Sequence, residues 1–263
     1  MASKPFSRFT QQWLALLLVG FATFAFADSP TEQESAPEPQ RFAYVIGASV
    51  SMGFNLNPFG SGHSPSLYVL SQMGYGKKQI VKKTVITGSF KRKFKWLRKK
   101  LKQRPPEIIL GLDLFHHDVR KKDTIDEKTY TYFNELLALF AETEIPVVVG
   151  TTWTRFENEH TIDEMNNYLK QKQAEIPNLY LFPAGEILDG VTKEGGVYHY
   201  QVNGVDLTLT KEDSRHFLLD VVHPNNKGAR LMGNVLIQVL NEEVGIEVPY
   251  YDISDVVEML ENK

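Results

Sequence analysis

Two short motifs near opposite ends of the chain carry residue types that can perform nucleophilic chemistry together. The first is Ser49, which stands at the carboxyl end of an apolar run that begins at Phe42. In open α/β sheets, ligands bind at the carboxyl ends of the strands. Ser51 is a competing candidate, but it lies past the strand end. Taken alone, a serine at this place also fits a helix N-cap or a turn.

The second motif is Asp220 and His223, followed by Pro224 and two asparagines. An Asp and a His three residues apart can face each other across one turn, so the carboxylate can hold the imidazole Nδ1–H. The Nε2 atom is then free to take a proton from a hydroxyl, which is the relation of orienting acid and base in a catalytic triad. The alternative is a capping pair at the start of the last long helix.

Alternating strands and helices predict the scaffold that positions these motifs. A parallel sheet covered by helices on both faces follows from such alternation, and Asn203-Gly204 between two period-2 runs predicts a hairpin over 197–210. We therefore expect an α/β fold: a three-layer α/β/α sandwich with a mostly parallel five-stranded sheet, decorated by the hairpin. The expected strands are Phe42–Ser49, Lys83–Gly88, Ile108–Phe115, Val147–Thr152 and Leu179–Pro183, and the expected helices are 65–74, 91–104, 130–143, 161–175 and 226–242.

Together the two motifs resemble those of the SGNH hydrolases, also called GDSL-type esterases and lipases. The chain has Gly47-Ala48-Ser49 where the family has Gly-Asp-Ser, and its late Asp-x-x-His-Pro block begins at Asp220. The resemblance implies a flavodoxin-like fold over 42–242, a triad of Ser49, Asp220 and His223, and carboxylic-ester substrates. It also implies backbone oxyanion donors at Ser49 and Gly88, with no cofactor or metal.

Asp113 departs from the family pattern. It stands in Gly111-Leu112-Asp113, where the family has Gly-x-Asn and the asparagine amide donates to the oxyanion. An ionised carboxylate cannot donate a hydrogen bond. Either Asp113 is buried and protonated and donates as a neutral acid, or it turns away to hold a loop and leaves the backbone donors alone.

Other polar and aromatic residues follow the third and fourth strands. His116 is expected to line the mouth of the crevice, and Trp153 and Arg155 are candidates for contact with a sugar or an anionic group, or else lie on the surface near a loop. A metal shared by His116, His117 and Asp118, with His160 or His63, is disfavoured because adjacent histidines point to opposite sides. The segment 53–66 is a candidate mobile lip over the site.

The N-terminal residues predict export. Lys4 and Arg8 precede the apolar stretch Trp13–Phe26, and a small-x-small pattern ends at Ala27, as in a cleaved signal peptide; the alternative is an uncleaved anchor. We expect a signal peptide over 1–27, a disordered acidic linker over 28–40, a hydrolase domain over 41–245 and a C-terminal tail over 246–263. The expected location is the bacterial periplasm or the medium. Since the chain has no Cys, disulfides and a cysteine nucleophile are excluded.

The formal net charge of −3 conceals two opposite blocks. Residues 39–106 carry 14 basic residues and no acid, whereas 107–263 carry 13 basic and 28 acidic ones. Nine of the basic residues lie in Lys91–Arg104, where helical spacing predicts an amphipathic helix with a solvated basic face. An anionic polysaccharide or lipid surface is the expected partner outside the cell, and nucleic acid is not.

The sequence therefore predicts an exported serine esterase that acts on an acyl or O-acetyl ester of a lipid, glycan or small molecule. A catalytically weak relative that binds an anionic envelope polymer is the alternative from another class. An acyltransferase with the same triad is a third.

Overall fold

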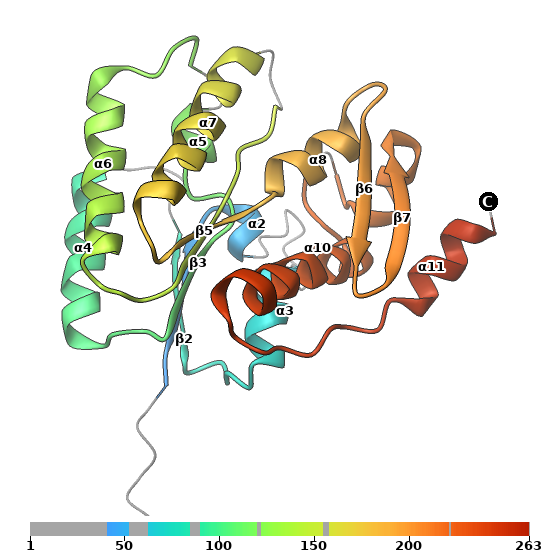
Figure 1. The fold of residues 1–263 in the computed structure, drawn as a ribbon, viewed down its shortest axis with the longest axis horizontal. Helices are drawn as coiled ribbons and strands as arrows, with labels where there is room; N and C mark the ends of the chain where they lie inside the picture. Colours follow the sequence, from blue (N-terminus) through green and yellow to red (C-terminus); the bar gives the residue numbers. More distant parts are fainter. Residues whose placement is uncertain are drawn as a thin grey trace, which may run out of the picture. The chain divides into compact units, whose positions relative to one another are not determined.

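A five-stranded, all-parallel sheet forms the centre of the domain in a computed structural model (Figure 1). The structure describes residues 41–52, 63–84, 90–119, 122–154, 158–220 and 222–262, with the side chains of 90–93 excepted. The predicted signal peptide and linker lie outside these residues. The strand order is β2-β1-β3-β4-β5, with β1 (Ala43–Gly47), β2 (Ile80–Thr84), β3 (Ile108–Gly111), β4 (Val147–Gly150) and β5 (Leu179–Phe182). This order and the parallel pairing confirm the predicted α/β class.

One strand begins three residues earlier than predicted. The second strand was expected over Lys83–Gly88, but β2 covers Ile80–Thr84, and residues 85–88 lie outside the described residues. Lys82 obscured its start, because charged residues inside a strand usually argue against burial. At the edge of the sheet, where β2 lies, lysines are common because they discourage pairing with other chains.

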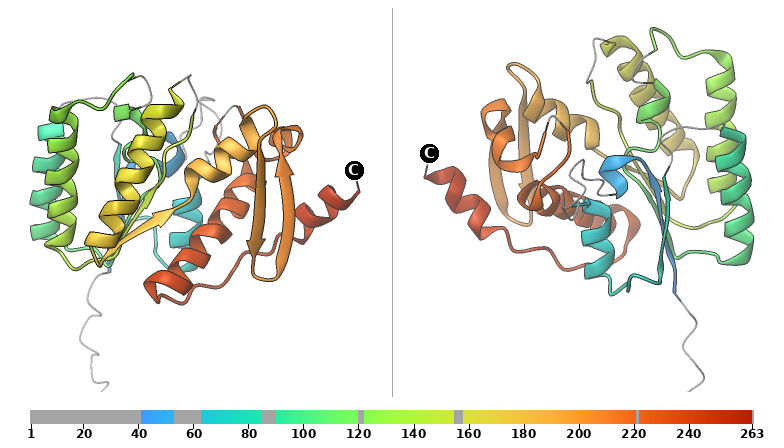
Figure 2. Two further views of the ribbon diagram at one scale, coloured as in Figure 1. Left: turned by 45° about the horizontal axis from the view of Figure 1, so that its top comes forward. Right: turned by 180° about the vertical axis from the view of Figure 1, so that it is seen from behind.

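Helices cover both faces of the sheet (Figures 1 and 2). On one face lie α4 (Phe90–Gln103), α6 (Glu127–Ala141) and α7 (Glu159–Glu175), and on the other lie α3 (Pro65–Gln72), α8 (Ala184–Thr192) and α10 (Asn226–Val239). Strand β1 serves both layers, because Tyr44 and Ile46 pack with the first set and Ala43 and Val45 with the second. Shorter helices are α2 (Ser49–Met52), α5 (His116–Val119), a 3-10 turn (Lys211–Asp213), α9 (Ser214–Phe217), a π turn (Leu240–Val244) and α11 (Ser254–Glu261).

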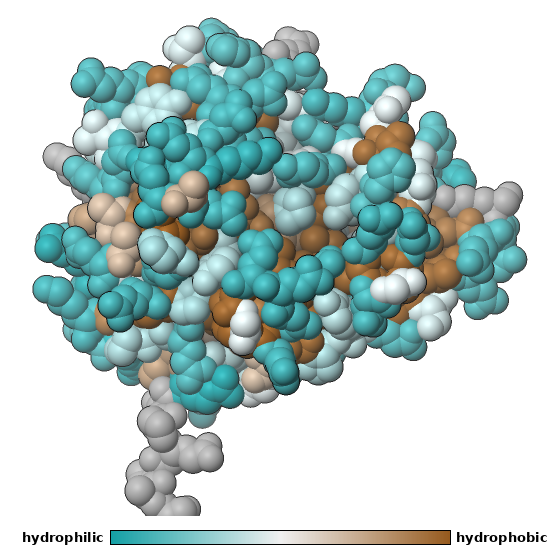
Figure 3. Space-filling model, in the orientation of Figure 1, coloured by the Kyte–Doolittle hydropathy of each residue, from teal (hydrophilic) through white to brown (hydrophobic). Residues whose placement is uncertain are grey.

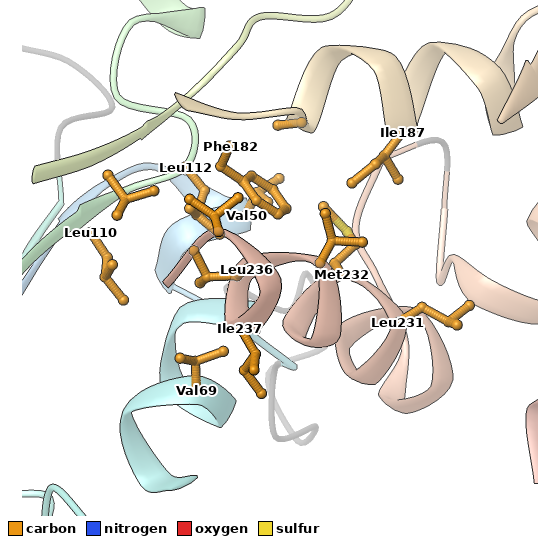
Figure 4. Packing of buried hydrophobic residues seen from close by; sticks show 14 of the residues in the cluster. Val50, Val69, Leu110, Leu112, Phe182, Ile187, Leu231, Met232, Leu236 and Ile237 are labelled. Atoms are coloured by element: carbon orange, nitrogen blue, oxygen red, sulfur yellow. The ribbon is translucent and has the colours of Figure 1, made fainter. Parts of the chain in front are cut away.

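The layer on the α10 side holds the cluster that fixes the turn after β1 against the last long helix (Figure 4). Val50, directly after Ser49, is fully buried and belongs to the same cluster as Phe182, Val69 and Leu236. These residues come from the start of α2, the end of β5, α3 and α10. Because interiors are close-packed, this cluster limits movement between the turn after β1 and α10.

The predicted hairpin is present as β6 (Val197–Val202) and β7 (Val205–Thr210), which pair antiparallel. Asn203 and Gly204 both have positive φ, 51° and 76°, as the two-residue hairpin turn of type I′ requires. Buried Tyr200 and Leu209 join the cluster that contains Ile187 of α8. The hairpin is therefore packed on the α8 side of the domain.

The C-terminal segment packs on the domain, whereas the sequence predicted a tail over 246–263. Residues Arg41–Lys263 form one compact unit, and Val248, Ile253 and Val256 are buried in its core. A groove of about 560 Å³ lies between the hairpin and α11, where Figure 3 shows hydrophobic residues at the surface. None of the described helices is long and apolar enough to cross a membrane.

Candidate active site

The chain reverses its direction of winding between β1 and β3. From β1 it passes to β2 on one side, and from β3 it passes to β4 on the other. Ligand sites of open α/β sheets lie at such a switch point, beyond the carboxyl ends of the strands. Ser49 begins α2 directly after β1, and Asp113 follows β3. The topology therefore brings these two predicted site residues to one place.

The Asp113 carboxylate holds the turn that carries Ser49. One oxygen, Oδ1, accepts hydrogen bonds from the Ala48 N–H at 2.7 Å and the Ser51 N–H at 3.3 Å, and Oδ2 accepts one from the Val50 N–H at 2.8 Å. Asp113 is 2% exposed. A methyl group on Gly47 would collide with Oδ1 of Asp113 and Oγ of Ser51, so the close approach requires glycine at that position.

The same contacts separate the two serine candidates. Ser51 is fully buried, and its Oγ donates to Asp113 Oδ1 at 2.5 Å while accepting from the Asp113 N–H at 3.2 Å. Ser49 is partly exposed. Among the described residues, the Ser49 N–H has no acceptor, whereas the N–H groups on both sides of it donate to Asp113. With respect to the described residues, Ser49 therefore keeps both its hydroxyl and its N–H available.

Burial raises the pKa of the Asp113 carboxyl above its ordinary value, and the hydrogen bonds from Ser51, Ala48 and Val50 act in the opposite direction. Each hydrogen-bond partner of the two oxygens among the described residues is a donor, which suits a carboxylate that only accepts. The side chain is turned toward the backbone of the turn that carries Ser49. Of the two alternatives left by the sequence, this orientation matches the one in which Asp113 holds a loop.

Asp220 and His223 form a compact turn before α10. Asp220 Oδ2 lies 2.5 Å from His223 Nδ1, and Oδ1 accepts from the N–H groups of Val222 at 2.8 Å and His223 at 2.9 Å. The Leu219 N–H donates to the His223 carbonyl at 2.7 Å and closes the turn. Because its Nδ1 faces a carboxylate, the imidazole keeps Nε2 for another partner.

Partial burial would raise the pKa of the Asp220 carboxyl, but the bonds from Val222 and His223 outweigh it and hold the pKa below its ordinary value. The His223 side chain is 12% exposed and that of Asp220 31%. A charged acceptor on Nδ1 at a partly open site is the arrangement that lets an imidazole act as a base.

Helix α3 connects the two motifs. Ser64, its N-cap, donates from Oγ to the Ser51 carbonyl at 2.6 Å. One turn further on, the Tyr68 hydroxyl donates to Asn226 Oδ1 at 2.6 Å, three residues after His223. The His63 Nδ1 atom lies 3.0 Å from the same hydroxyl. No hydrogen bond joins Ser49 to His223 within the described part of the chain.

His116 and Trp153 are buried, which differs from the expected position at the crevice mouth. They are 2% and 3% exposed, and their rings stack with centroids 3.7 Å apart. The apolar indole and the flat imidazole are covered by the layers around them, so neither presents a ring face to solvent. Gly88 and Arg155 lie outside the described residues, as does most of the segment 53–66. No group of three metal-ligating side chains is found among the residues that the structure describes.

Sequence reasoning did not find Tyr68 as a part of this region, nor the contacts that Ser64 and Asn226 make in it. The N-cap serine and the proline after it give a local signal for a helix start. No local signal indicates that Tyr68 reaches Asn226, because the two residues are 158 positions apart.

Comparison with known proteins finds similar folds among solved structures but no similar sequence. No family sequence model and no curated protein sequence matches the chain. Among solved structures, a psychrotrophic esterase from a Pseudoalteromonas species, inhibited by monoethylphosphonate, is similar at a TM-score of 0.52 and 14% identity, and the match covers 78% of this chain and 100% of that one.

Two further structures give the same result. A lipase/acylhydrolase from Enterococcus faecalis has a TM-score of 0.51 and 14% identity over 80% of this chain and 100% of its own. A variant of an acetyl-xylooligosaccharide esterase from Geobacillus stearothermophilus has a TM-score of 0.51 and 16% identity, over 81% of this chain and 97% of its own. The described domain therefore has the α/β fold of the SGNH, or GDSL-type, hydrolases.

Proposed function

We propose that the protein is a serine esterase that cleaves a carboxylic ester through an acyl-enzyme. The observation that carries the proposal is the Asp220–His223 contact of 2.5 Å, in a turn that α3 connects to the strand-end Ser49. In this proposal Ser49 is the nucleophile, His223 the base and Asp220 the group that orients the imidazole. The fold shared with esterases and acylhydrolases agrees with the assignment.

The Ser49 Oγ attacks the ester carbonyl while His223 Nε2 takes its proton, and Asp220 stabilises the imidazolium that forms. The carbonyl oxygen becomes an oxyanion that the Ser49 N–H and the Gly88 N–H stabilise. Collapse expels the alcohol, which leaves with the proton from His223. Water, deprotonated by the same imidazole, then attacks the acyl-enzyme and releases the acid and free Ser49.

Asp113 serves this mechanism by position. Its carboxylate binds the N–H groups of Ala48, Val50 and Ser51 and leaves that of Ser49, which in this proposal donates to the oxyanion. The backbone donors then act without the side-chain amide that the family motif supplies. Loss of one oxyanion donor typically costs on the order of 10²–10³ in turnover, so a slow enzyme is expected.

The substrate and location belong to the same proposal. The predicted signal peptide supports export to a bacterial envelope or the medium, where acylated glycans and lipids are the available esters. One structural relative is named as an esterase of acetylated xylooligosaccharides, which supports an O-acetyl glycan. If a sugar hydroxyl instead of water attacked the acyl-enzyme, the same residues would transfer the acyl group to the sugar.

A fluorophosphonate probe tests the nucleophile. We expect covalent labelling of the full chain and of a Ser71→Ala variant, whose exposed serine lies on α3, and none in Ser49→Ala. Hydrolysis of p-nitrophenyl esters from C2 to C12 should be lost in Ser49→Ala and His223→Ala and kept in His160→Ala, a change at an exposed position. An unlabelled, inactive full chain that still binds an anionic polymer would overturn the esterase in favour of the binding protein.

A further inference from the structure

An unpaired cluster of cations surrounds the edge strand β2 and the outer side of α4. The cluster, named here the basic rim, consists of Lys77, Lys78, Lys82 and Lys83 from β2 and the residues before it, and Lys95, Arg98, Lys99, Lys102 and Arg104 from α4 and its end. Except for the half-buried Lys83, all of them are exposed. Within the described residues none of the nine forms a salt bridge.

The two parts of the basic rim are one surface. The Lys83 Nζ lies 5.5 Å from the centre of the Trp96 ring, which joins β2 to α4. The Tyr44 hydroxyl donates to the carbonyls of Lys100 and Arg104, at 3.1 and 2.5 Å, and attaches the end of α4 to the sheet. Since Leu97 and Leu101 are buried, the lysines and arginines of the helix are left on its outer side.

The basic rim begins at the edge of the sheet that carries Ser49. Strands β1 and β2 are parallel, with Gly47 opposite Thr84, so the end of β2 lies beside the turn that leads to Ser49. Helix α4 connects the carboxyl end of β2 to the start of β3 and therefore runs back along the sheet (Figure 1). A long ligand on the basic rim could thus extend from α4 to the candidate active site.

We propose that the basic rim binds an anionic polysaccharide and that this polymer carries the ester cleaved at Ser49. The inference rests on the proposed esterase function and specifies its substrate class. Self-repulsion among the cations supports it, because the charge of Lys77 adds to partial desolvation, the larger cause, in lowering the pKa of Lys82. A polyanion would relieve that repulsion, and such electrostatic attraction also concentrates the ligand near the site.

The shape of the basic rim favours a flexible polymer over a bilayer. In a strand, successive side chains point to opposite faces, so Lys82 and Lys83 extend to different sides of the sheet edge. A planar membrane would reach one of these sides, whereas a flexible chain can follow both. The exposed large hydrophobic residues among those described are Val197 and Leu219, and both lie outside the basic rim, so its described part has no fully exposed large apolar side chain for insertion into lipid.

Binding is measured with the full chain carrying Ser49→Ala, so that no ester is consumed. The probes are polygalacturonate, neutral dextran, duplex DNA, and vesicles of phosphatidylglycerol or of phosphatidylcholine. The test variant adds Lys95→Gln, Arg98→Gln, Lys99→Gln and Lys102→Gln. The matched control removes four exposed cations elsewhere, Lys128→Gln, Lys170→Gln, Lys211→Gln and Arg215→Gln, and therefore has the same net charge.

We expect polygalacturonate to bind at low salt and dextran not to bind. Affinity for polygalacturonate should fall at least about tenfold in the test variant and less than about twofold in the control, since local rather than net charge acts. Binding to the vesicles or to DNA that is as tight as binding to polygalacturonate would overturn the choice of polymer. Equal losses of affinity in the two variants would show that the basic rim is not the binding surface. Small-ester hydrolysis by the unmodified chain tests the esterase separately.

Discussion

At the residue scale, the bonds of Asp113 distinguish a positioning role from a donating one. In Asp113→Asn the amide oxygen replaces one carboxylate oxygen, and the NH₂ group then faces a backbone N–H, such as that of Val50, which now donates to Oδ2. A buried donor left without an acceptor costs about 1–3 kcal/mol. We expect the free energy of unfolding to fall by that amount and kcat for p-nitrophenyl acetate to fall with it.

Asp163→Asn, at an exposed position of α7, is the control for Asp113→Asn and should leave both quantities unchanged. Undiminished stability with a raised kcat in Asp113→Asn would show that the position donates to the oxyanion, as the family asparagine does, and would contradict the positioning role.

The pKa of Asp220 makes a second prediction at this scale. The carboxyl has its pKa held below the ordinary 3.8 in the folded protein. Its contribution to stability is therefore present above the unfolded-state pKa and is lost as the pH falls through the folded-state value. Asp220→Asn should be less stable than the original chain at pH 7, and the difference should shrink below about pH 4.

Urea unfolding at several pH values measures this difference. At pH 7 the kcat of Asp220→Asn should be lower on the order of 10⁴-fold, as expected when a triad carboxylate is removed. A stability difference that is independent of pH, or a kcat close to that of the unchanged chain, would argue against the orienting role.

Much of the site was predictable at the residue scale because its motifs are local. The strand-end position of Ser49 and the three-residue spacing of Asp220 and His223 can be read from neighbours in the chain. The orientation of Asp113 could not be read in this way, because its partners lie more than sixty positions away. His116 and Trp153 look like surface residues after strands, and only the packing of the layers shows that they are buried.

At the element scale, α10 contains two glycines in different surroundings. A methyl group at Gly228 would collide with the Phe217 carbonyl, whereas at Gly233 it would lie 3.9 Å from Tyr251 and Val69. We expect Gly228→Ala to destabilise the protein by about 1–3 kcal/mol through overpacking. Gly233→Ala should stabilise it by up to about 1 kcal/mol, the difference in helix propensity.

The first change should also lower esterase activity, because the Phe217 carbonyl accepts from the Asn225 N–H at 2.8 Å and so fixes the segment after His223. Thermal unfolding and p-nitrophenyl acetate hydrolysis measure both effects, with Gly233→Ala as the matched control. Equal effects of the two substitutions would contradict the close approach of α10 to Phe217.

The predicted elements are confirmed where the apolar pattern is strong. They are wrong or missing where packing against the rest of the fold outweighs local propensity. The four strands other than β2 begin within one residue of the predicted positions, because buried parallel strands are continuous apolar runs. Helix α8 was not predicted, since Gly185 and Gly190 weaken its helical propensity. Both glycines lie where a methyl group would collide with neighbouring backbone, so packing favours them at the expense of propensity.

At the scale of the whole molecule, the charges of the sequence remain partly separated in the fold. The first block places its cations on the basic rim, and its one ion pair to the second block among the described residues joins Arg41 to Glu107. Composition could indicate that the charges are separated but not where the cations lie on the surface. Their position depends on the crossover from β2 through α4 to β3, which brings the two cationic segments together. The C-terminal segment was interpreted as a tail because it has few apolar residues. Only the fold shows that these residues pack in the cluster that contains α10.

That segment provides a prediction for the molecule as a whole. The Asn234 side chain of α10 bonds to both the N–H and the carbonyl of Tyr251, at 2.7 and 3.0 Å, and the Tyr251 hydroxyl donates to the Tyr68 carbonyl at 2.5 Å. Deletion of residues 249–263 removes these bonds and uncovers the surfaces on which Ile253 and Val256 pack. Full burial of one such side chain contributes about 1.5–3 kcal/mol, so we expect a loss of roughly 3–6 kcal/mol in the free energy of unfolding.

Because Tyr68 also bonds to Asn226 beside the His223 turn, the same deletion should lower kcat for p-nitrophenyl acetate under conditions where the shortened chain is still folded. Urea denaturation followed by circular dichroism measures stability, and fluorophosphonate labelling in the folded range measures the site. Deletion of residues 262 and 263 alone is the control and should change neither, since Asn262 is exposed. A chain that ends at residue 248 with an unchanged urea midpoint and unchanged labelling would mean that the segment is a tail, as its composition suggested.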